Sequence, residues 1–246
     1  DAATRVGKMH EIRIHGRGGQ GAVLAGGILA TAFVQAGKHV VAVPSFGFER
    51  RGAPVASFLR VDEAPIRQMT NIYRPDCILC IDPTVGRAVN VFDGITEGAV
   101  LVQATARPLA ELTIPERITC VGVCDAVQLA LAIFGRPITN TIMLGAFART
   151  TGLVSLDALR FAVEHSSFRD AGLRQNLEAL LVVGSADDLD DEVEIGCLVH
   201  ELEPIVGAVG EQMLQPGPAL ADAVENGLCA SAIGDVGWRQ VDHQKP

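Results

Sequence analysis

The chain has 246 residues and a formal net charge of −9 at pH 7, and an acidic chain without clustered Lys and Arg is a poor candidate for nucleic-acid binding. Its apolar fraction of 48% is high, but its apolar runs are broken well short of the roughly 18 residues a membrane span needs, so we expect burial against partner subunits and no span. Six cysteines in a chain of this length do not indicate a disulfide framework, and the N-terminal region lacks the apolar core of a secretion signal, which favours the cytoplasm.

Strand and helix patterns alternate along most of the chain. A strand over 10–15 leads through a glycine turn into an apolar helix over 22–35. Further strands are predicted over 40–43, 55–61, 77–81, 99–102 and 118–123, and further helices over 125–134 and 139–150, from 155, and over 173–182. We expect the strand over 55–61 to lie at a sheet edge, because Pro54 cannot donate a ladder hydrogen bond. The predicted fold is α/β, a mostly parallel open sheet with helices on both faces.

The composition divides the chain at about residue 185. Residues 9–185 are predicted to form the α/β domain, and residues 186–246 an acidic linker followed by an extended C-terminal arm that contacts partner subunits. Six carboxylates lie between Asp187 and Glu194, and they lack the glycine and the spacing of a calcium loop. We therefore interpret them as a solvated linker and not as a metal site.

The glycine turn Gly16-Arg17-Gly18-Gly19-Gln20-Gly21 lies between the first strand and the first helix. Such a turn directs backbone N–H groups and the positive end of a helix dipole toward one point, which suits a phosphate. A dinucleotide site also needs an acidic residue about 20 positions further on, after the second strand. No acid occurs there before Glu49. A phosphate-bearing ligand other than a dinucleotide is therefore favoured, and a turn that serves only close packing remains an alternative.

A second loop, bounded by Gly47 and Gly52, carries Glu49, Arg50 and Arg51. An Arg side chain presents a planar fork that suits bidentate contact with phosphate. These two guanidinium groups either reach a phosphate held by the glycine turn or form an ion-pair cluster between subunits.

Four sequence blocks, taken together, resemble the gamma subunit of the 2-oxoacid:acceptor oxidoreductases, the family that includes pyruvate:ferredoxin oxidoreductase. The blocks are the glycine turn, residues 45–54, residues 137–146, and residues 176–179. The resemblance implies that this chain helps to bind coenzyme A (CoA). The implied CoA contacts are Gly18, Gly19, Gln20, Gly21 and Ala22 in the turn, Arg50 or its neighbour Arg51 as the cation, and Asn140 and Asn176 as amides. Asn140 as a helix N-cap and Asn176 as a surface residue without a ligand remain alternatives.

The resemblance also implies partners and cofactors. Thiamine diphosphate, Mg²⁺ and [4Fe-4S] clusters would lie on alpha, beta and delta subunits, and the electron acceptor would be ferredoxin or a further flavin or NAD subunit. The complex would oxidatively decarboxylate a 2-oxoacid to an acyl-CoA, which leaves this chain without catalytic residues of its own. No metal site is expected, because Cys77 and Cys80 would point to opposite faces of a strand. The alternatives are a free-standing NAD(P)-dependent enzyme and a purely structural subunit.

Overall fold

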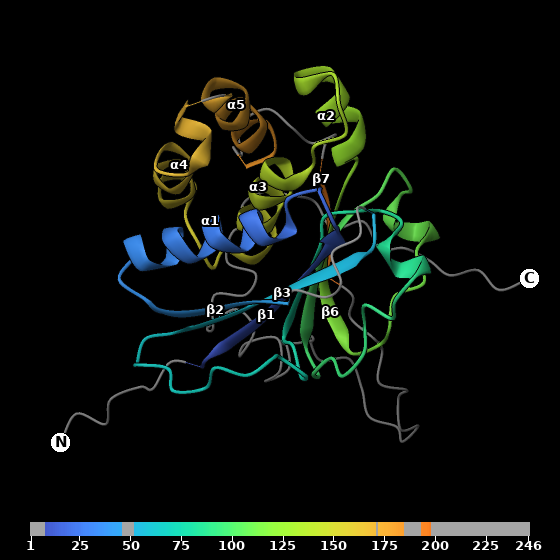
Figure 1. Ribbon diagram of the computed structural model, residues 1–246. Helices are drawn as coiled ribbons and strands as arrows, with labels where there is room; N and C mark the ends of the chain where they lie inside the picture. The colour runs from blue at the N-terminus through green and yellow to red at the C-terminus, as the bar shows by residue number, and fades with distance from the viewer. Residues whose placement is uncertain (1–7, 46–51, 171, 185–192, 198–246) are drawn as a thin grey trace, which may run out of the picture.

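The fold is built on one seven-stranded sheet (Figure 1). The computed structural model describes residues 8–45, 52–170, 172–184 and 193–197. Its strands are β1 (His10–Arg17), β2 (His39–Ser45), β3 (Pro54–Asp62), β4 (Cys77–Cys80), β5 (Ala99–Ala104), β6 (Ile118–Cys124) and β7 (Val193–Cys197). Its α-helices are α1 (Ala22–Gln35), α2 (Ala126–Phe134), α3 (Asn140–Thr151), α4 (Leu156–Glu164) and α5 (Leu173–Gly184), with short 3-10 helices η1 (Val85–Arg87), η2 (Leu109–Glu111) and η3 (Ser167–Asp170).

The strand order is β2-β3-β1-β4-β5-β6-β7. Strands β1, β4, β5 and β6 are parallel neighbours, and β2 shares their direction because it pairs antiparallel with β3, which itself pairs antiparallel with β1. The predicted mostly parallel α/β sheet is confirmed. The prediction that the strand over 55–61 is an edge strand is wrong, since β3 lies between β2 and β1. Pro54 is the first residue of β3, opposite Arg17, so its missing N–H falls at the end of the ladder.

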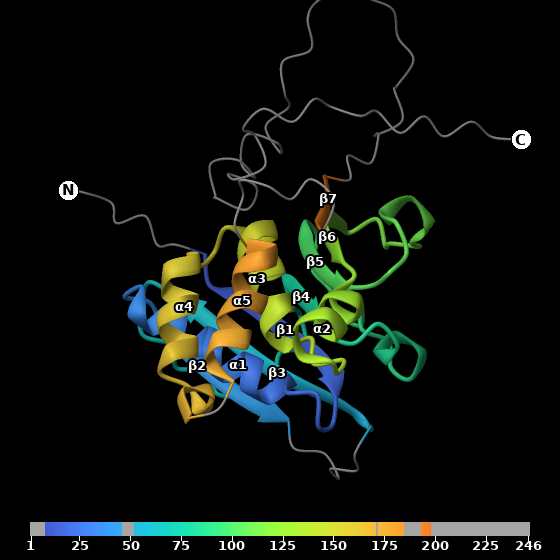
Figure 2. The ribbon, with the colours of Figure 1, turned by 90° about the horizontal axis from the view of Figure 1, so that it is seen from above.

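The two faces of the sheet are covered differently. The five α-helices of the described residues share one apolar core with residues such as Ile14 and Leu79 on one face (Figures 1 and 2). The other face carries a second, smaller core, covered by loops and the short helices η1 and η2. Among the described residues the α-helices therefore cover one face of the sheet, and the helices on the other face are the short 3-10 helices η1 and η2. The connections after β4 and β5 contain prolines, glycines and charged residues without a helical apolar period, and they form turns and single 3-10 helices instead of α-helices.

Capping residues set several helix boundaries. Asp125 and Ser155 accept hydrogen bonds from the backbone N–H groups of Gln128 (3.1 Å) and Ala158 (3.2 Å), which begins α2 and α4. Gly135 ends α2 in the left-handed conformation, which glycine adopts without strain. These local signals explain why the predicted helices match the observed ones within a residue or two.

Strand β7 pairs antiparallel with β6 at the edge of the sheet. Its five residues fall in the stretch predicted as linker and arm. The proposed boundary at residue 185 stays a prediction, and the predicted arm, residues 198–246, lies outside the described residues.

Close packing of α3 on α5 requires a glycine at position 145. A Cβ placed on Gly145 would overlap the carbonyl oxygen of Leu180 and lie 3.2 Å from the backbone nitrogen of Gly184. We expect Gly145→Ala to lower the free energy of unfolding by roughly 1–3 kcal/mol, as overpacking does. The matched control is Gly27→Ala on α1, where a Cβ meets no atom within 4 Å. It should raise the unfolding free energy by about 0.5–1 kcal/mol, the usual gain for Ala over Gly within a helix. Urea unfolding measures the unfolding free energy of both variants, and equal changes in the two would contradict the role of Gly145 in close packing.

Candidate functional site

The glycine turn lies where the connectivity of the sheet reverses direction. From β1 the chain passes through α1 to β2 on one side, while the parallel neighbour of β1 on the other side is β4. Ligands of open α/β sheets bind at such switch points, outside the carboxyl ends of the strands. The crevice between the ends of β1 and β4 is therefore the candidate site.

Glycine is required at two positions of the turn. Gly19 and Gly21 have φ values of +88° and +85°, in the left-handed region that favours glycine. Gly21 is the N-cap of α1, and no side chain caps this helix end. The first N–H groups of an α-helix have no acceptor within the helix and carry the positive end of its dipole. The start of α1 can therefore receive an anion.

Arg17 connects two other loops to the end of β1. Its Nε donates to the Thr84 hydroxyl (2.9 Å) and lies 3.4 Å from Oδ1 of Asp82, while Nη2 donates to the Thr84 carbonyl (3.0 Å). Its Nη1 donates to the Gly52 carbonyl (2.9 Å). The loop after β4 and the base of the loop before β3 are thus fixed to the end of β1 by one guanidinium.

Asp82 is a buried carboxylate beside the turn. Burial alone would raise the pKa of Asp82, but hydrogen bonds from Thr84 and Gln20 and the charge of Arg17 together hold it below its ordinary value. Asp82 is therefore ionised at neutral pH, and Arg17 compensates its charge.

Sequence reasoning missed Arg17, Asp82 and Thr84 as organisers of this site. The available signal was the position of Asp82-Pro83-Thr84 directly after a buried parallel strand, since such strands end at the same edge as β1.

Gly18 and Gln20 use their backbone N–H groups inside the protein. Gly18 donates to the Ala53 carbonyl (2.8 Å), and Gln20 donates to the Arg17 carbonyl (3.1 Å). The Gln20 side chain accepts from the backbone N–H of Arg17 (3.1 Å) and donates to Oδ2 of Asp82 (2.5 Å). These two residues therefore hold the shape of the turn, which leaves the N–H groups of Gly19, Gly21 and Ala22 as the better candidates for an anion.

The two predicted loops lie side by side at their bases. Besides the bond from Gly18 to Ala53, the backbone N–H of Gly52 donates to the Gly18 carbonyl (3.1 Å). Arg50 and Arg51, the predicted cationic contacts, lie outside the described residues.

Asn140 lies directly against the turn. It is the first residue of α3, 3% exposed, and a Cβ on Gly21 would come within 2.5 Å of its Nδ2. Its Oδ1 accepts from the backbone N–H of Thr141 (2.9 Å). Thr139, not Asn140, is the N-cap of α3, and its hydroxyl donates to the Ile81 carbonyl (2.6 Å) at the end of β4. The ends of α1 and α3 thus meet beside the crevice, with the Asn140 amide between them.

Asn176 lies behind Asn140 and is buried on α5. Its Oδ1 accepts from the Thr141 hydroxyl (3.0 Å) and its Nδ2 donates to the Gly172 carbonyl (2.9 Å). Each end of the Asn176 amide therefore already has a partner within the protein, which favours a supporting role over ligand contact.

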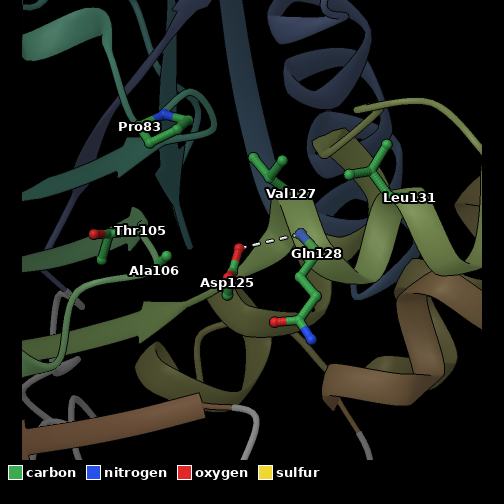
Figure 3. A pocket seen from close by; sticks show the side chains of 7 residues that line it. All are labelled: Pro83, Thr105, Ala106, Asp125, Val127, Gln128 and Leu131. Atoms are coloured by element: carbon green, nitrogen blue, oxygen red, sulfur yellow. Dashed lines mark hydrogen bonds between the residues drawn. The ribbon is translucent and has the colours of Figure 1, made fainter.

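A hollow of about 420 Å³ adjoins the crevice at the ends of β4, β5 and β6. It is lined by Pro83, Thr105, Ala106, Asp125, Val127, Gln128 and Leu131. Figure 3 shows the Asp125 carboxylate between the Thr105–Ala106 side and Val127. The Thr105 hydroxyl accepts from the backbone N–H of Arg107 (3.0 Å). The hollow therefore offers mainly apolar walls and one carboxylate. Pro83, which lines the hollow, directly follows Asp82 in the chain.

Cys77 and Cys80, the two cysteines of β4, are both buried. Cys77 belongs to the core under the helices and Cys80 to the core on the other face, as their spacing in a strand predicts. Burial raises the pKa of Cys77 well above its ordinary value and that of Cys80 to about 12. Metal ligation needs a thiolate, so neither cysteine is suited to it. Within the described residues, no group of three or more His, Cys, Asp or Glu side chains could hold a metal ion.

The fold and the site define a Rossmann-like α/β domain with a glycine turn at its switch point. A family model described as pyruvate ferredoxin/flavodoxin oxidoreductase matches residues 11–182. The chain belongs to this family.

Named relatives agree with this assignment. The chain is 62% identical over 172 residues to the gamma subunit of NADH-dependent phenylglyoxylate dehydrogenase from Aromatoleum evansii, covering 70% of this chain and 90% of that protein. A solved structure of pyruvate oxidoreductase subunit PORC from Thermotoga maritima matches with a TM-score of 0.62 and 33% identity, covering 76% of this chain and 98% of that one. The 2-oxoglutarate:ferredoxin oxidoreductase from Magnetococcus marinus, solved with 2-oxoglutarate, CoA and succinyl-CoA bound, matches with a TM-score of 0.58 over 70% of this chain and 30% of that one. At 23% identity this last likeness shows the fold alone.

No helix within the described ranges is long and apolar enough to cross a membrane.

Proposed function

We propose that this chain is the gamma subunit of a CoA-acylating 2-oxoacid oxidoreductase and that its glycine turn holds a phosphate group of CoA. The observation that carries the proposal is the start of α1, which has a glycine N-cap without a side-chain cap and lies against the Asn140 amide. An uncapped helix start with an adjacent amide suits a phosphate through backbone N–H groups and the helix dipole. The structure determined for the Magnetococcus relative includes CoA, which agrees with this ligand class.

The adjoining hollow would take the adenine ring of the same ligand. Its apolar walls suit an aromatic ring, and the Asp125 carboxylate suits an exocyclic amino group, which donates hydrogen bonds. The carboxylate would repel a phosphate placed there. The phosphates therefore belong at the start of α1 and the base in the hollow.

Thiamine diphosphate, Mg²⁺ and [4Fe-4S] clusters would lie on alpha, beta and delta partner subunits, and the acceptor would be ferredoxin or a flavin or NAD subunit. The 2-oxoacid would be oxidatively decarboxylated there and its acyl group transferred to CoA. Phenylglyoxylate is the first 2-oxoacid to assay with the assembled complex, because a relative 62% identical to this chain is named for it.

A free-standing NAD(P)-dependent enzyme is the weaker alternative. The acidic residue that binds the ribose of NAD follows the second strand of the motif, next to the glycine turn. In this chain β3 separates β2 from β1, so the end of β2 does not adjoin the crevice beside β4.

The test is Gly21→Ala in the assembled complex. An added Cβ would be strained at φ +85° and would crowd the Asn140 amide at 2.5 Å, so we expect the KM for CoA to rise about tenfold, roughly 1.4 kcal/mol. The matched control is Gly37→Ala, which has a similar φ of +80° but no atom within 4 Å of its Cβ position. It should leave the KM for CoA unchanged.

The outcome that supports a purely structural subunit is an unchanged KM for CoA in Gly21→Ala while the complex stays assembled on gel filtration. Asn140→Asp provides a second measurement, because it preserves the shape of the side chain and its acceptor for the Thr141 N–H. Its added negative charge should weaken CoA binding in a calorimetric titration.

A further inference from the structure

Two buried arginines on neighbouring strands face away from the helices and bind loop carbonyls. Arg60 on β3 is 3% exposed; its Nη1 donates to the Thr70 carbonyl (2.5 Å) and its Nη2 to the Asn71 carbonyl (3.3 Å). Its Nε pairs with the Glu11 carboxylate (2.8 Å). A buried guanidinium whose donors are distributed in this way fixes the path of the loop it binds.

Arg13 on β1 does the same for a second loop. It is 7% exposed, and its Nη2 donates to the carbonyls of Val91 (2.9 Å) and Asp93 (2.6 Å). In the ladder between β1 and β3, Glu11 lies opposite Arg60, so Arg13 is two residues further along on the same face. Both loops are therefore held over the same face of the sheet.

The two loops are also joined to each other. The backbone N–H and the hydroxyl of Thr96 both donate to the Pro75 carbonyl, at 3.0 and 3.2 Å. Gly94 has a φ of +70°, and the Tyr73 carbonyl oxygen occupies the place where its Cβ would lie. Residues 67–74, which we call the platform, are thus held from below by Arg60 and from the side by the loop that Arg13 binds.

The platform presents large side chains to solvent. Met69 is 73% exposed and Tyr73 is 74% exposed, and Tyr73 is the only tyrosine of the chain. Arg67 and Arg74 at its two ends are exposed as well. The Met69 and Tyr73 side chains, held away from the core, gain no burial energy within this chain. Tyr, Met and Arg are enriched at protein interfaces.

We propose that the platform docks into another subunit of the oxidoreductase complex, on a surface with an apolar pocket for Tyr73 and Met69 rimmed by carboxylates. The charge pattern indicates the chemistry of the partner surface: in a chain with a net charge of −9, residues 67–74 carry two Arg and no acidic residue. Such a basic, apolar loop complements an acidic partner surface. Because the loop is already ordered, docking loses less conformational entropy than the ordering of a flexible segment would.

The proposal rests on the chain being a subunit of a complex and is independent of CoA binding. The test is the affinity of the full-length chain for the remaining subunits purified from the complex, measured by biolayer interferometry. We expect the double variant Met69→Ser with Tyr73→Ala to raise the Kd about a hundredfold. Both side chains are exposed, so its melting temperature should equal that of the wild type. Val34→Ser on α1, an equally apolar and 59% exposed site, is the control and should leave the Kd unchanged.

The charge component is tested separately. Arg67→Glu with Arg74→Glu should raise the Kd about tenfold at low salt, and the difference should shrink as salt screens the pair. An unchanged Kd in both double variants overturns the proposal, whether or not CoA binds. Sedimentation tests a second copy of the chain as the occupant. If the wild type forms dimers, Met69→Ser with Tyr73→Ala makes the chain monomeric, and the Kd for the other subunits is unchanged, the occupant is a second copy and the proposal is overturned.

Discussion

Replacing Arg17 by Met is expected to raise the KM for CoA about a hundredfold in the assembled complex. The substitution removes the guanidinium that bonds to Thr84 and Gly52 and leaves the buried Asp82 carboxylate without its compensating charge. Two like unit charges separated by about 6 Å repel by roughly 2–3 kcal/mol at an effective dielectric constant of about 20, so an uncompensated carboxylate close to a phosphate would cost one to two orders of magnitude in affinity. The loops that Arg17 joins would also lose their fixed position.

The same variant should be partly rescued by a second change. Asp82→Asn removes the charge but keeps an acceptor for Thr84, so the double variant Arg17→Met with Asp82→Asn should recover about tenfold of the lost affinity. Arg160→Met on α4, an exposed arginine paired with Glu164, is the control and should not change the KM. If Arg17→Met and Arg160→Met give the same KM as the wild type, no phosphate lies beside Asp82. If the double variant shows no rescue, the whole rise in the KM of Arg17→Met comes from the changed position of the loops that Arg17 joins.

Local patterns predicted most of the fold. The α1 helix over 22–35 was predictable to the residue because an apolar run follows a glycine turn, and the start of α4 was predictable because Ser155 is an N-cap. The position of β3 inside the sheet was not predictable in this way, since strand order depends on pairing between residues distant in the sequence. The same holds for β7, whose five residues pair with residues of β6 that lie 69 to 77 positions earlier in the chain.

In the candidate site, too, local features were predictable from the sequence and contacts between distant residues were not. Glycines at positions 19 and 21 follow from turn chemistry, and the structure places both in the left-handed region. The hydrogen bonds from Arg17 and Gln20 to Asp82 join residues more than 60 positions apart, so no local pattern indicated them. For the same reason the partner of Asn176 could not be read from its helix: the Thr141 hydroxyl comes from α3.

The two sites that we propose lie on different parts of the sheet. The helix face and the carboxyl ends of the parallel strands shape the proposed ligand site, while the other face carries Arg13 and Arg60 and the loops they bind. No residue is shared between the start of α1 and the platform. Variants of the platform should therefore change assembly, and variants of the turn should change the KM for CoA.

Arg60→Met is expected to lower the free energy of unfolding by roughly 3–5 kcal/mol, the usual cost of breaking a buried ion pair. Met fills similar volume but leaves the Glu11 carboxylate and the carbonyls of Thr70 and Asn71 without their donor. Arg117→Met is the matched control, because Arg117 is 63% exposed and pairs with the exposed Glu97. It should cost less than about 1 kcal/mol. Urea unfolding of both variants gives the comparison.

Arg60→Met should also loosen the platform. Amide hydrogen exchange over residues 67–74 is expected to accelerate relative to that of β4, because the loop loses the donor that fixes its carbonyls. Docking of the variant should weaken even though Met69 and Tyr73 are intact, because the partner would then have to order the loop. If unfolding free energy falls but exchange over 67–74 and the Kd are both unchanged, Arg60 stabilises the sheet alone and does not set the shape of the platform.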